Sequence, residues 1–145
     1  MGRISEQVEG ARAGTNELVI CRLASGWVVA GETQILPGYC LLLPDPVVAS
    51  LNDLEGTVRD RFLSDMARIG DVVLRATGAA RINYEILGNV EPELHAHVIP
   101  RYADEPDERR RTTVWFHDWG AAPAFSRDAH GALFQEIRRL LEPGH

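Results

Sequence analysis

The sequence has few cysteines, no long apolar run and no excess of positive charge. Its 145 residues include two cysteines, Cys21 and Cys40, which are too few for a disulfide framework, and each lies in an apolar run typical of a buried free thiol. No segment reaches the roughly 18 apolar residues that a membrane span needs. The net charge of −6 argues against nucleic acids and anionic membranes as partners, because both bind basic surfaces.

Features of a targeting signal are missing too. The first residues, MGRISEQVEG, contain no apolar signal-peptide core, and Glu6 stands where a myristoylation motif has Ser or Thr. We therefore expect a cytoplasmic protein. The length fits a single domain, residues 1–145, which is large enough to fold without a disulfide or a metal.

Short β-branched and apolar runs predict an antiparallel sheet of about five strands. Residues 1–16 are small and polar, and we expect them to form an irregular tail. Three runs separated by turn residues follow at 17–23, 26–32 and 39–46, which is the pattern of a meander. Two further runs, residues 81–88 and 93–100, predict two more strands.

Helical spacing replaces this pattern in two places. One apolar stripe predicts a helix of about five turns that ends at Gly78; it comprises Val58, Phe62, Met66, Ile69 and Val73. Residues 103–145 form a C-terminal arm and helix, in which 103–111 is a charged solvated loop and 113–119 is a short strand or an arm. The final helix begins after Ser126 and has the stripe Ala129, Leu133, Ile137 and Leu140. The fold class is therefore α+β.

The stretch ELHAHVIPR, residues 93–101, carries the candidate chemistry. Side chains alternate along a strand, so Glu93, His95 and His97 should share one face, and the strand should end at Pro100. An exposed polar face is one interpretation. A metal-dependent enzyme is another, with the His-x-His pair and Glu93 or His117 as ligands.

Phosphoryl chemistry uses more of these residues. A neutral imidazole can attack phosphorus, and a second can act as general acid and base. Arg101 and the turn near Asn89 could then hold phosphate oxygens. Asn83, in the strand before, is a further candidate for substrate binding. His130 and His145 look like surface residues.

The same stretch resembles the signature of the histidine triad (HIT) superfamily, in which histidines alternate with apolar residues and Pro-Arg often follows. The passages ILPGYCLLLPDPVVASLNDL and ATGAARINYEILGN are similar to family sequence as well, so the resemblance covers residues 17–102. It implies that His95 is the nucleophile and that His97 is the third triad member. It also implies a HIT-like sheet with one long helix, and a homodimer built partly on that helix and on the penultimate strand.

The resemblance implies hydrolysis or transfer of a nucleotidyl group through a nucleotidyl-histidine. Substrates of the family include diadenosine polyphosphates, adenosine phosphoramidates and nucleotide sugars. No protein-bound cofactor or metal is expected, although a polyphosphate substrate can bring its own Mg²⁺. A nucleotide-binding protein with weak or no catalysis is the alternative.

This sequence departs from the family pattern at three points. Glu93 replaces the first histidine, where a carboxylate could orient His95 but would repel an anionic substrate. The connection from Asn89 to His95 is short, and Gly31 stands where an Asn or Asp usually binds ribose. Aromatic residues that could cover a base are Tyr102 and Trp115, and a segment with His117 and Trp119 could close over the site.

Overall fold

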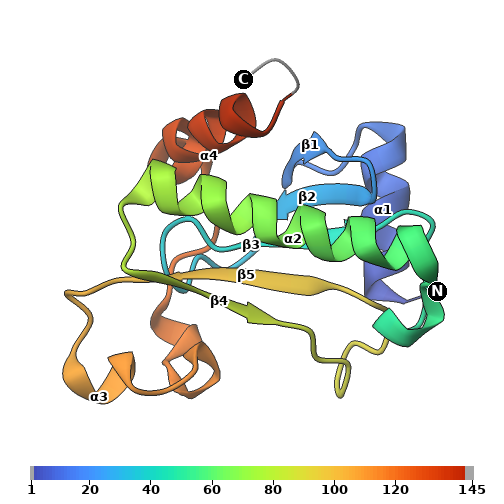
Figure 1. The fold of residues 1–145 in the computed structure, drawn as a ribbon. Helices are drawn as coiled ribbons and strands as arrows, with labels where there is room; N and C mark the ends of the chain where they lie inside the picture. Colours follow the sequence, from blue (N-terminus) through green and yellow to red (C-terminus); the bar gives the residue numbers. More distant parts are fainter. Residues whose placement is uncertain (1, 143–145) are drawn as a thin grey trace.

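A computed structural model describes residues 2–142 and has a five-stranded antiparallel sheet at its centre (Figure 1). The strands lie in the order β1-β2-β3-β5-β4, so β1 and β4 form the two edges. Their bounds are β1 (Val19–Arg22), β2 (Gly26–Ala30), β3 (Cys40–Pro44), β4 (Arg81–Glu85) and β5 (Ala96–Arg101). The predicted α+β class with five antiparallel strands is confirmed.

Strand β5 differs from its predicted bounds at both ends. It begins at Ala96, three residues after Glu93, because the Leu94 N–H bonds to the Val48 carbonyl 2.9 Å away and the Glu93 side chain turns to another partner. It also continues through Pro100, which pairs with Ile82, to Arg101. The expected strand end at Pro100 is therefore wrong by one residue.

One face of the sheet is covered by α2 (Gly56–Thr77) and α4 (Arg127–Leu141). Gly78 ends α2 as predicted, with the left-handed φ of 70° that glycine adopts easily. The stripe of α2 is correct from Phe62 onward, but Val58 is 56% exposed because the first turn of α2 extends past the strands (Figure 1).

Helix α4 is capped as predicted, because the Ser126 hydroxyl accepts from the Ala129 N–H. Its buried face lies one residue further round than expected and comprises His130, Phe134, Ile137 and Leu141. The expectation that His130 is a surface residue is wrong. Its ring stacks on Phe125, and its Nδ1 accepts from the Ser126 N–H at 3.0 Å. His145 lies outside the described residues.

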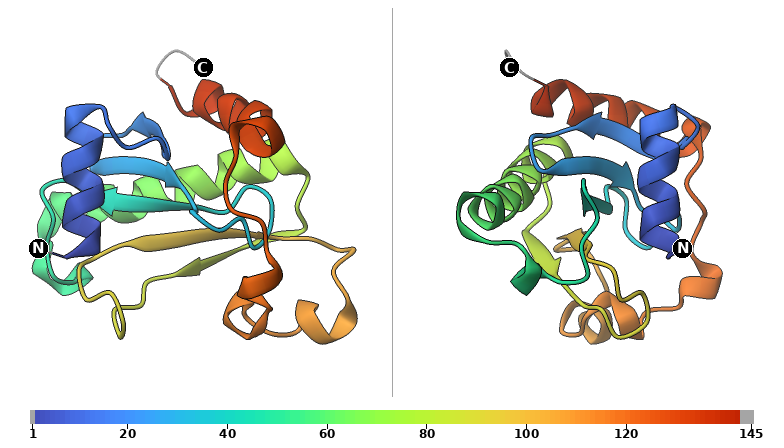
Figure 2. Two further views of the ribbon diagram at one scale, coloured as in Figure 1. Left: turned by 180° about the vertical axis from the view of Figure 1, so that it is seen from behind. Right: turned by 90° about the vertical axis from the view of Figure 1, so that its right-hand side faces the viewer.

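The other face of the sheet carries a helix where an irregular tail was expected. Residues Arg3–Ala13 form α1, which lies across the sheet from α2 (Figure 2). Ile4 and Val8 of α1 are buried against Val29 and Leu43. The prediction for residues 1–16 fails because apolar residues at a helical spacing of four anchor an otherwise polar segment.

The segment after β5 forms α3 (Asp107–Arg110) and two 3-10 turns, Val114–Phe116 and Trp119–Ala121. A further 3-10 turn, Leu51–Asp53, precedes α2. The segment 113–119 is therefore an arm rather than a strand. Within residues 2–142, no helix is both long enough and apolar enough to cross a membrane.

Candidate active site

His95 and His97 lie together on the face of the sheet that also carries α1. Their neighbours Leu94, Ala96 and Val98 point the other way, into the core under α2. The two imidazole rings are nearly perpendicular, at 78°, with centroids 4.8 Å apart. The residues are only 6% and 7% exposed, so the predicted pair exists but lies at the base of a covered site rather than on an open face.

The His95 ring is held by the backbone two residues before it. Its Nδ1 lies 2.8 Å from the Glu93 carbonyl oxygen. A carbonyl oxygen can only accept, so Nδ1 must carry the hydrogen. This leaves Nε2 of His95 as the nitrogen with a free lone pair.

The His97 ring is held by a hydroxyl group. Its Nδ1 lies 2.8 Å from the hydroxyl oxygen of Tyr39, which precedes β3. Burial, with a smaller contribution from the charge of His95, lowers the pKa of His97 to about 4. His97 is therefore a neutral imidazole at neutral pH.

The Glu93 carboxylate does not join the histidines. It accepts hydrogen bonds from the hydroxyl and from the backbone N–H of Ser5 in the first turn of α1, the latter at 3.0 Å. These bonds lower the pKa of Glu93, the one from the hydroxyl most. The expectation that this carboxylate orients His95 is corrected: the backbone carbonyl of Glu93 does so, because its side chain caps α1.

A cavity of about 210 Å³ lies over the two histidines. Tyr39 and Trp119 form part of its wall, and α1 contributes Arg3 and Gln7. Arg3 pairs with Glu32, which also lines the cavity. Sequence reasoning missed Tyr39 and the α1 residues; Tyr39 lies two residues before Leu41, which pairs with His97, and this register is not visible in the sequence.

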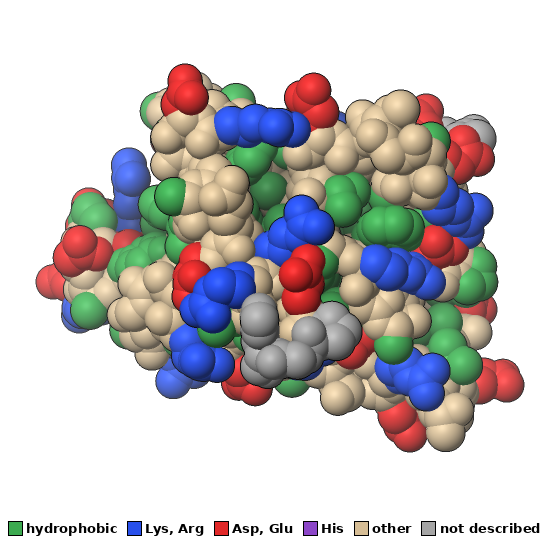
Figure 3. Space-filling view, turned by 90° about the horizontal axis from the view of Figure 1, so that it is seen from above, with side chains coloured by type: hydrophobic (Ala, Val, Ile, Leu, Met, Phe, Trp, Pro, Cys, Tyr) green, Lys and Arg blue, Asp and Glu red, His purple; other side chains and the backbone are tan. Residues whose placement is uncertain are grey.

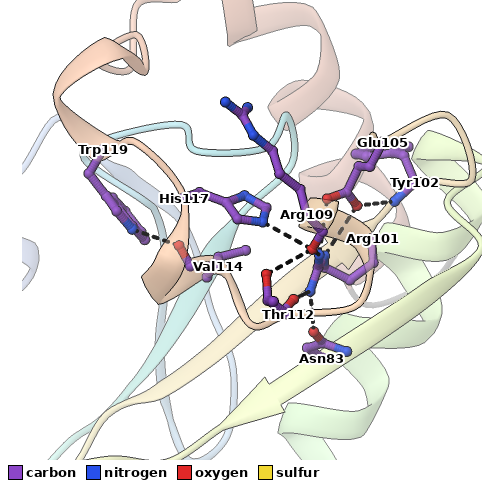
Figure 4. Close-up of polar contacts among 9 residues, drawn as sticks. All are labelled: Asn83, Arg101, Tyr102, Glu105, Arg109, Thr112, Val114, His117 and Trp119. Atoms are coloured by element: carbon purple, nitrogen blue, oxygen red, sulfur yellow. Dashed lines mark hydrogen bonds and ion pairs between the residues drawn. The ribbon is translucent and has the colours of Figure 1, made fainter. Parts of the chain in front are cut away.

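Arg101 is too fully bonded to hold a phosphate in this structure. Its guanidinium donates to both carboxylate oxygens of Glu105, to Asn83 Oδ1 and to the carbonyls of Thr112 and Arg109, at 2.7–3.1 Å (Figure 4). These five bonds use all five N–H groups. Arg101 and Asn83 therefore fasten the segment after β5 to the sheet.

The remaining candidates divide between the site and its surroundings. Trp115 lies against His97 with ring centroids 5.0 Å apart and stacks on Trp119. His117 is buried beside the Arg109 carbonyl, in the group around Arg101 (Figure 4). Tyr102 donates to the Pro37 carbonyl, and Asn89 is exposed in the β4–β5 connection and does not line the cavity.

The sequence pattern of the HIT domain matches residues 28–104, which is more than half of the chain. The chain is a member of the HIT family. No protein of curated function matches it.

Solved structures of other HIT proteins share the fold. A histidine triad protein from Bradyrhizobium japonicum is 21% identical with a TM-score of 0.77, and the match covers 91% of this chain and 96% of that one. One from Marinobacter aquaeolei is 19% identical with a TM-score of 0.74, covering 90% and 93%. A hypothetical histidine triad nucleotide-binding protein from Sulfolobus tokodaii is 12% identical with a TM-score of 0.72, covering 93% and 90%.

This HIT protein also shows why position 31 is glycine. A Cβ on Gly31 would lie 2.2 Å from Cδ2 of Tyr39, so the tyrosine ring occupies the space that a side chain at position 31 would need. Position 31 therefore has no side chain that could make the ribose contact which the resemblance associates with it.

Proposed function

We propose that this HIT protein is a nucleotide hydrolase or nucleotidyl transferase that acts through a nucleotidyl-histidine at His95. The observation that carries the proposal is the hydrogen bond from His95 Nδ1 to the Glu93 carbonyl. Because this bond places the hydrogen on Nδ1, the lone pair of Nε2 is available as the nucleophile. Nε2 belongs to a ring that lies next to a second imidazole and under a cavity. Membership of the HIT family supports the same chemistry.

The reaction has two displacements at one phosphorus. Nε2 of His95 bonds to phosphorus as the bond to the leaving oxygen or nitrogen breaks, and the electron pair departs with the leaving group, which takes a proton from solvent or from His97 once that ring has been protonated. Water or another acceptor then attacks the phosphorus, loses a proton, and returns the electron pair to Nε2. Neutral His97 donates a hydrogen bond to a phosphate oxygen. The bound anion raises the pKa of His97, so this histidine can then act as acid and base.

Substrates of the proposed reaction are nucleoside phosphoanhydrides, phosphoramidates and related compounds, including diadenosine polyphosphates. A polyphosphate would carry its own Mg²⁺. Arg3, rather than Arg101, is the cation that lines the cavity and can approach such an anion. We further propose that the protein works as a cytoplasmic homodimer.

A binding protein with weak or no catalysis is the second candidate. It is favoured by the saturation of Arg101 and by the presence of Glu32 and Glu91 in the cavity wall, since carboxylates there oppose charge build-up on a phosphate. The metal-dependent alternative lacks both proposed third ligands, because the Glu93 carboxylate is bound to Ser5 and His117 lies beside the Arg109 carbonyl. Within residues 2–142, no group of three potential ligands forms.

Intact-protein mass spectrometry after a rapid quench without acid tests the proposal. With diadenosine tetraphosphate, the wild type should gain one nucleotidyl mass, and His95→Ala should gain none and release no AMP. His130→Gln, which changes a histidine of α4, is the matched control and should behave as the wild type does. Binding of the substrate with neither adduct nor AMP would contradict catalysis and favour the binding protein.

A further inference from the structure

We propose that Tyr39 is a positioning residue that holds His97 with its hydrogen on Nε2, ready to donate to the reacting phosphate. The inference rests on the proposed function for its catalytic meaning. The structural part of the inference is the location of the hydrogen on the His97 ring, and this part depends only on the contacts that Tyr39 makes.

The Tyr39 ring has a fixed place in the site. The residue is 5% exposed, and its ring lies parallel to His97, at 22°, with centroids 5.9 Å apart. Trp119 packs edge-on against it at 6.1 Å. Gly31 lies directly behind the ring, where even a Cβ would collide with it. The hydroxyl group therefore has little freedom to leave His97.

The direction of the Tyr39–His97 hydrogen bond follows from the surroundings of the hydroxyl. Burial raises the pKa of Tyr39, so the phenol keeps its hydrogen. Among the described residues, His97 Nδ1 is the one hydrogen-bond partner that the hydroxyl has, at 2.8 Å. A buried hydroxyl donor left without an acceptor is costly, so the hydroxyl donates and Nδ1 accepts.

The two rings consequently hold their hydrogens on opposite nitrogens. His95 carries its hydrogen on Nδ1, held by the Glu93 carbonyl, and offers a lone pair at Nε2. His97 carries its hydrogen on Nε2 and offers a donor. The site thus presents one nitrogen that attacks and one N–H that stabilises charge on the phosphate, with the rings 4.8 Å apart.

Tyr39→Phe tests the inference, because it removes the hydroxyl and leaves the ring that packs against Gly31 and Trp119. In protein labelled with ¹⁵N-histidine, two-bond ¹H–¹⁵N correlations report which nitrogen of His97 is protonated; His97→Gln assigns the signals. The wild type should show protonated Nε2, and Tyr39→Phe should show a mixture of tautomers. Tyr84→Phe, which removes the hydroxyl of a tyrosine in β4, should leave His97 unchanged.

Activity gives the second readout. In Tyr39→Phe, kcat for AMP release from diadenosine tetraphosphate should fall by about tenfold or more while KM changes little, since a misplaced proton affects the transition state. A wild type with protonated Nδ1 on His97 would overturn the inference, and so would a Tyr39→Phe protein with the wild-type tautomer. A tautomer shift in a protein that forms no adduct would instead reject the proposed function alone.

Discussion

Neutral His97 couples the site to the stability of the fold. The pKa of a histidine in an unfolded chain is about 6.5, and burial lowers that of His97 to about 4. The unfolded state therefore binds the proton more tightly, and protonation favours unfolding. The stability that neutral His97 contributes is present above about pH 6.5 and is lost as the pH falls to about 4, by roughly 3 kcal/mol.

His97→Gln should flatten this part of the pH dependence. We expect the free energy of unfolding, measured with urea, to fall less between pH 7 and pH 4.5 in His97→Gln than in the wild type. Other carboxylates titrate in this window in both proteins, so the difference between the two slopes is the quantity to compare. Equal slopes would contradict the lowered pKa of His97.

The roles of single residues were predictable only where alternation or a motif specified them. Alternation placed His95 and His97 on one face. The motif also suggested Arg101 as a phosphate ligand, but the sequence could not reveal that Glu105 and two carbonyls would take four of the five N–H groups of its guanidinium, because those partners lie in a segment without periodicity. Tyr39 escaped notice because its approach to His97 depends on the register of β3 against β5.

At the scale of elements, α1 and the residues before β5 form one unit. The N-cap residue Gly2 has no side chain to cap α1, and the Glu93 carboxylate supplies the missing acceptor. The backbone of Glu93 at the same time holds His95. The first turn of α1 therefore helps to place the proposed nucleophile.

Ser5→Ala should loosen this unit. Loss of the hydroxyl bond to Glu93 should lower the free energy of unfolding by about 1 kcal/mol, as is typical of one hydrogen bond, and should also lower kcat. Ser50→Ala, which removes an exposed hydroxyl bond to Asp53, is the matched control and should change neither. A loss of stability with unchanged kcat would confine α1 to a structural role.

Elements whose apolar residues recur with a clear periodicity were predicted well, but α1 was not predicted. Helix α2 has a long apolar stripe and a glycine stop, and both were visible in the sequence. Helix α1 is short and contains Gly10, so its own propensity is weak, and docking of Ile4 and Val8 onto the sheet stabilises it. Such tertiary stabilisation leaves little trace in a local pattern.

At the scale of the molecule, charge is dispersed. Figure 3 shows arginines interspersed with acidic side chains over the face that carries α4, and Arg138 and Arg139 pair there with Glu142 and Glu136. Several large apolar side chains stay exposed, and two of them are Val58 of α2, at 56%, and Tyr84 of β4, at 40%. Both lie on elements that the expected homodimer would use.

Val58→Asp should therefore weaken the dimer at least tenfold, as measured by light scattering over a range of concentrations against the 16.1 kDa mass of one chain. The third position of a helix favours an acidic residue, so α2 itself should not suffer. Phe116→Asp, at an exposed position of the 3-10 turn Val114–Phe116, is the control. An unchanged dimer, or a wild type that is monomeric, would exclude α2 as the interface.

The contact between Gly2 and Glu93 has a practical consequence for handling the protein. A Cβ at position 2 would lie 2.0 Å from the Glu93 carboxylate, whose backbone holds the proposed nucleophile. Any side chain introduced at position 2 when the protein is cloned would therefore press on the turn that steadies the reaction centre. A residue introduced at an exposed position of α4, a helix on the opposite face of the sheet, would leave that turn undisturbed.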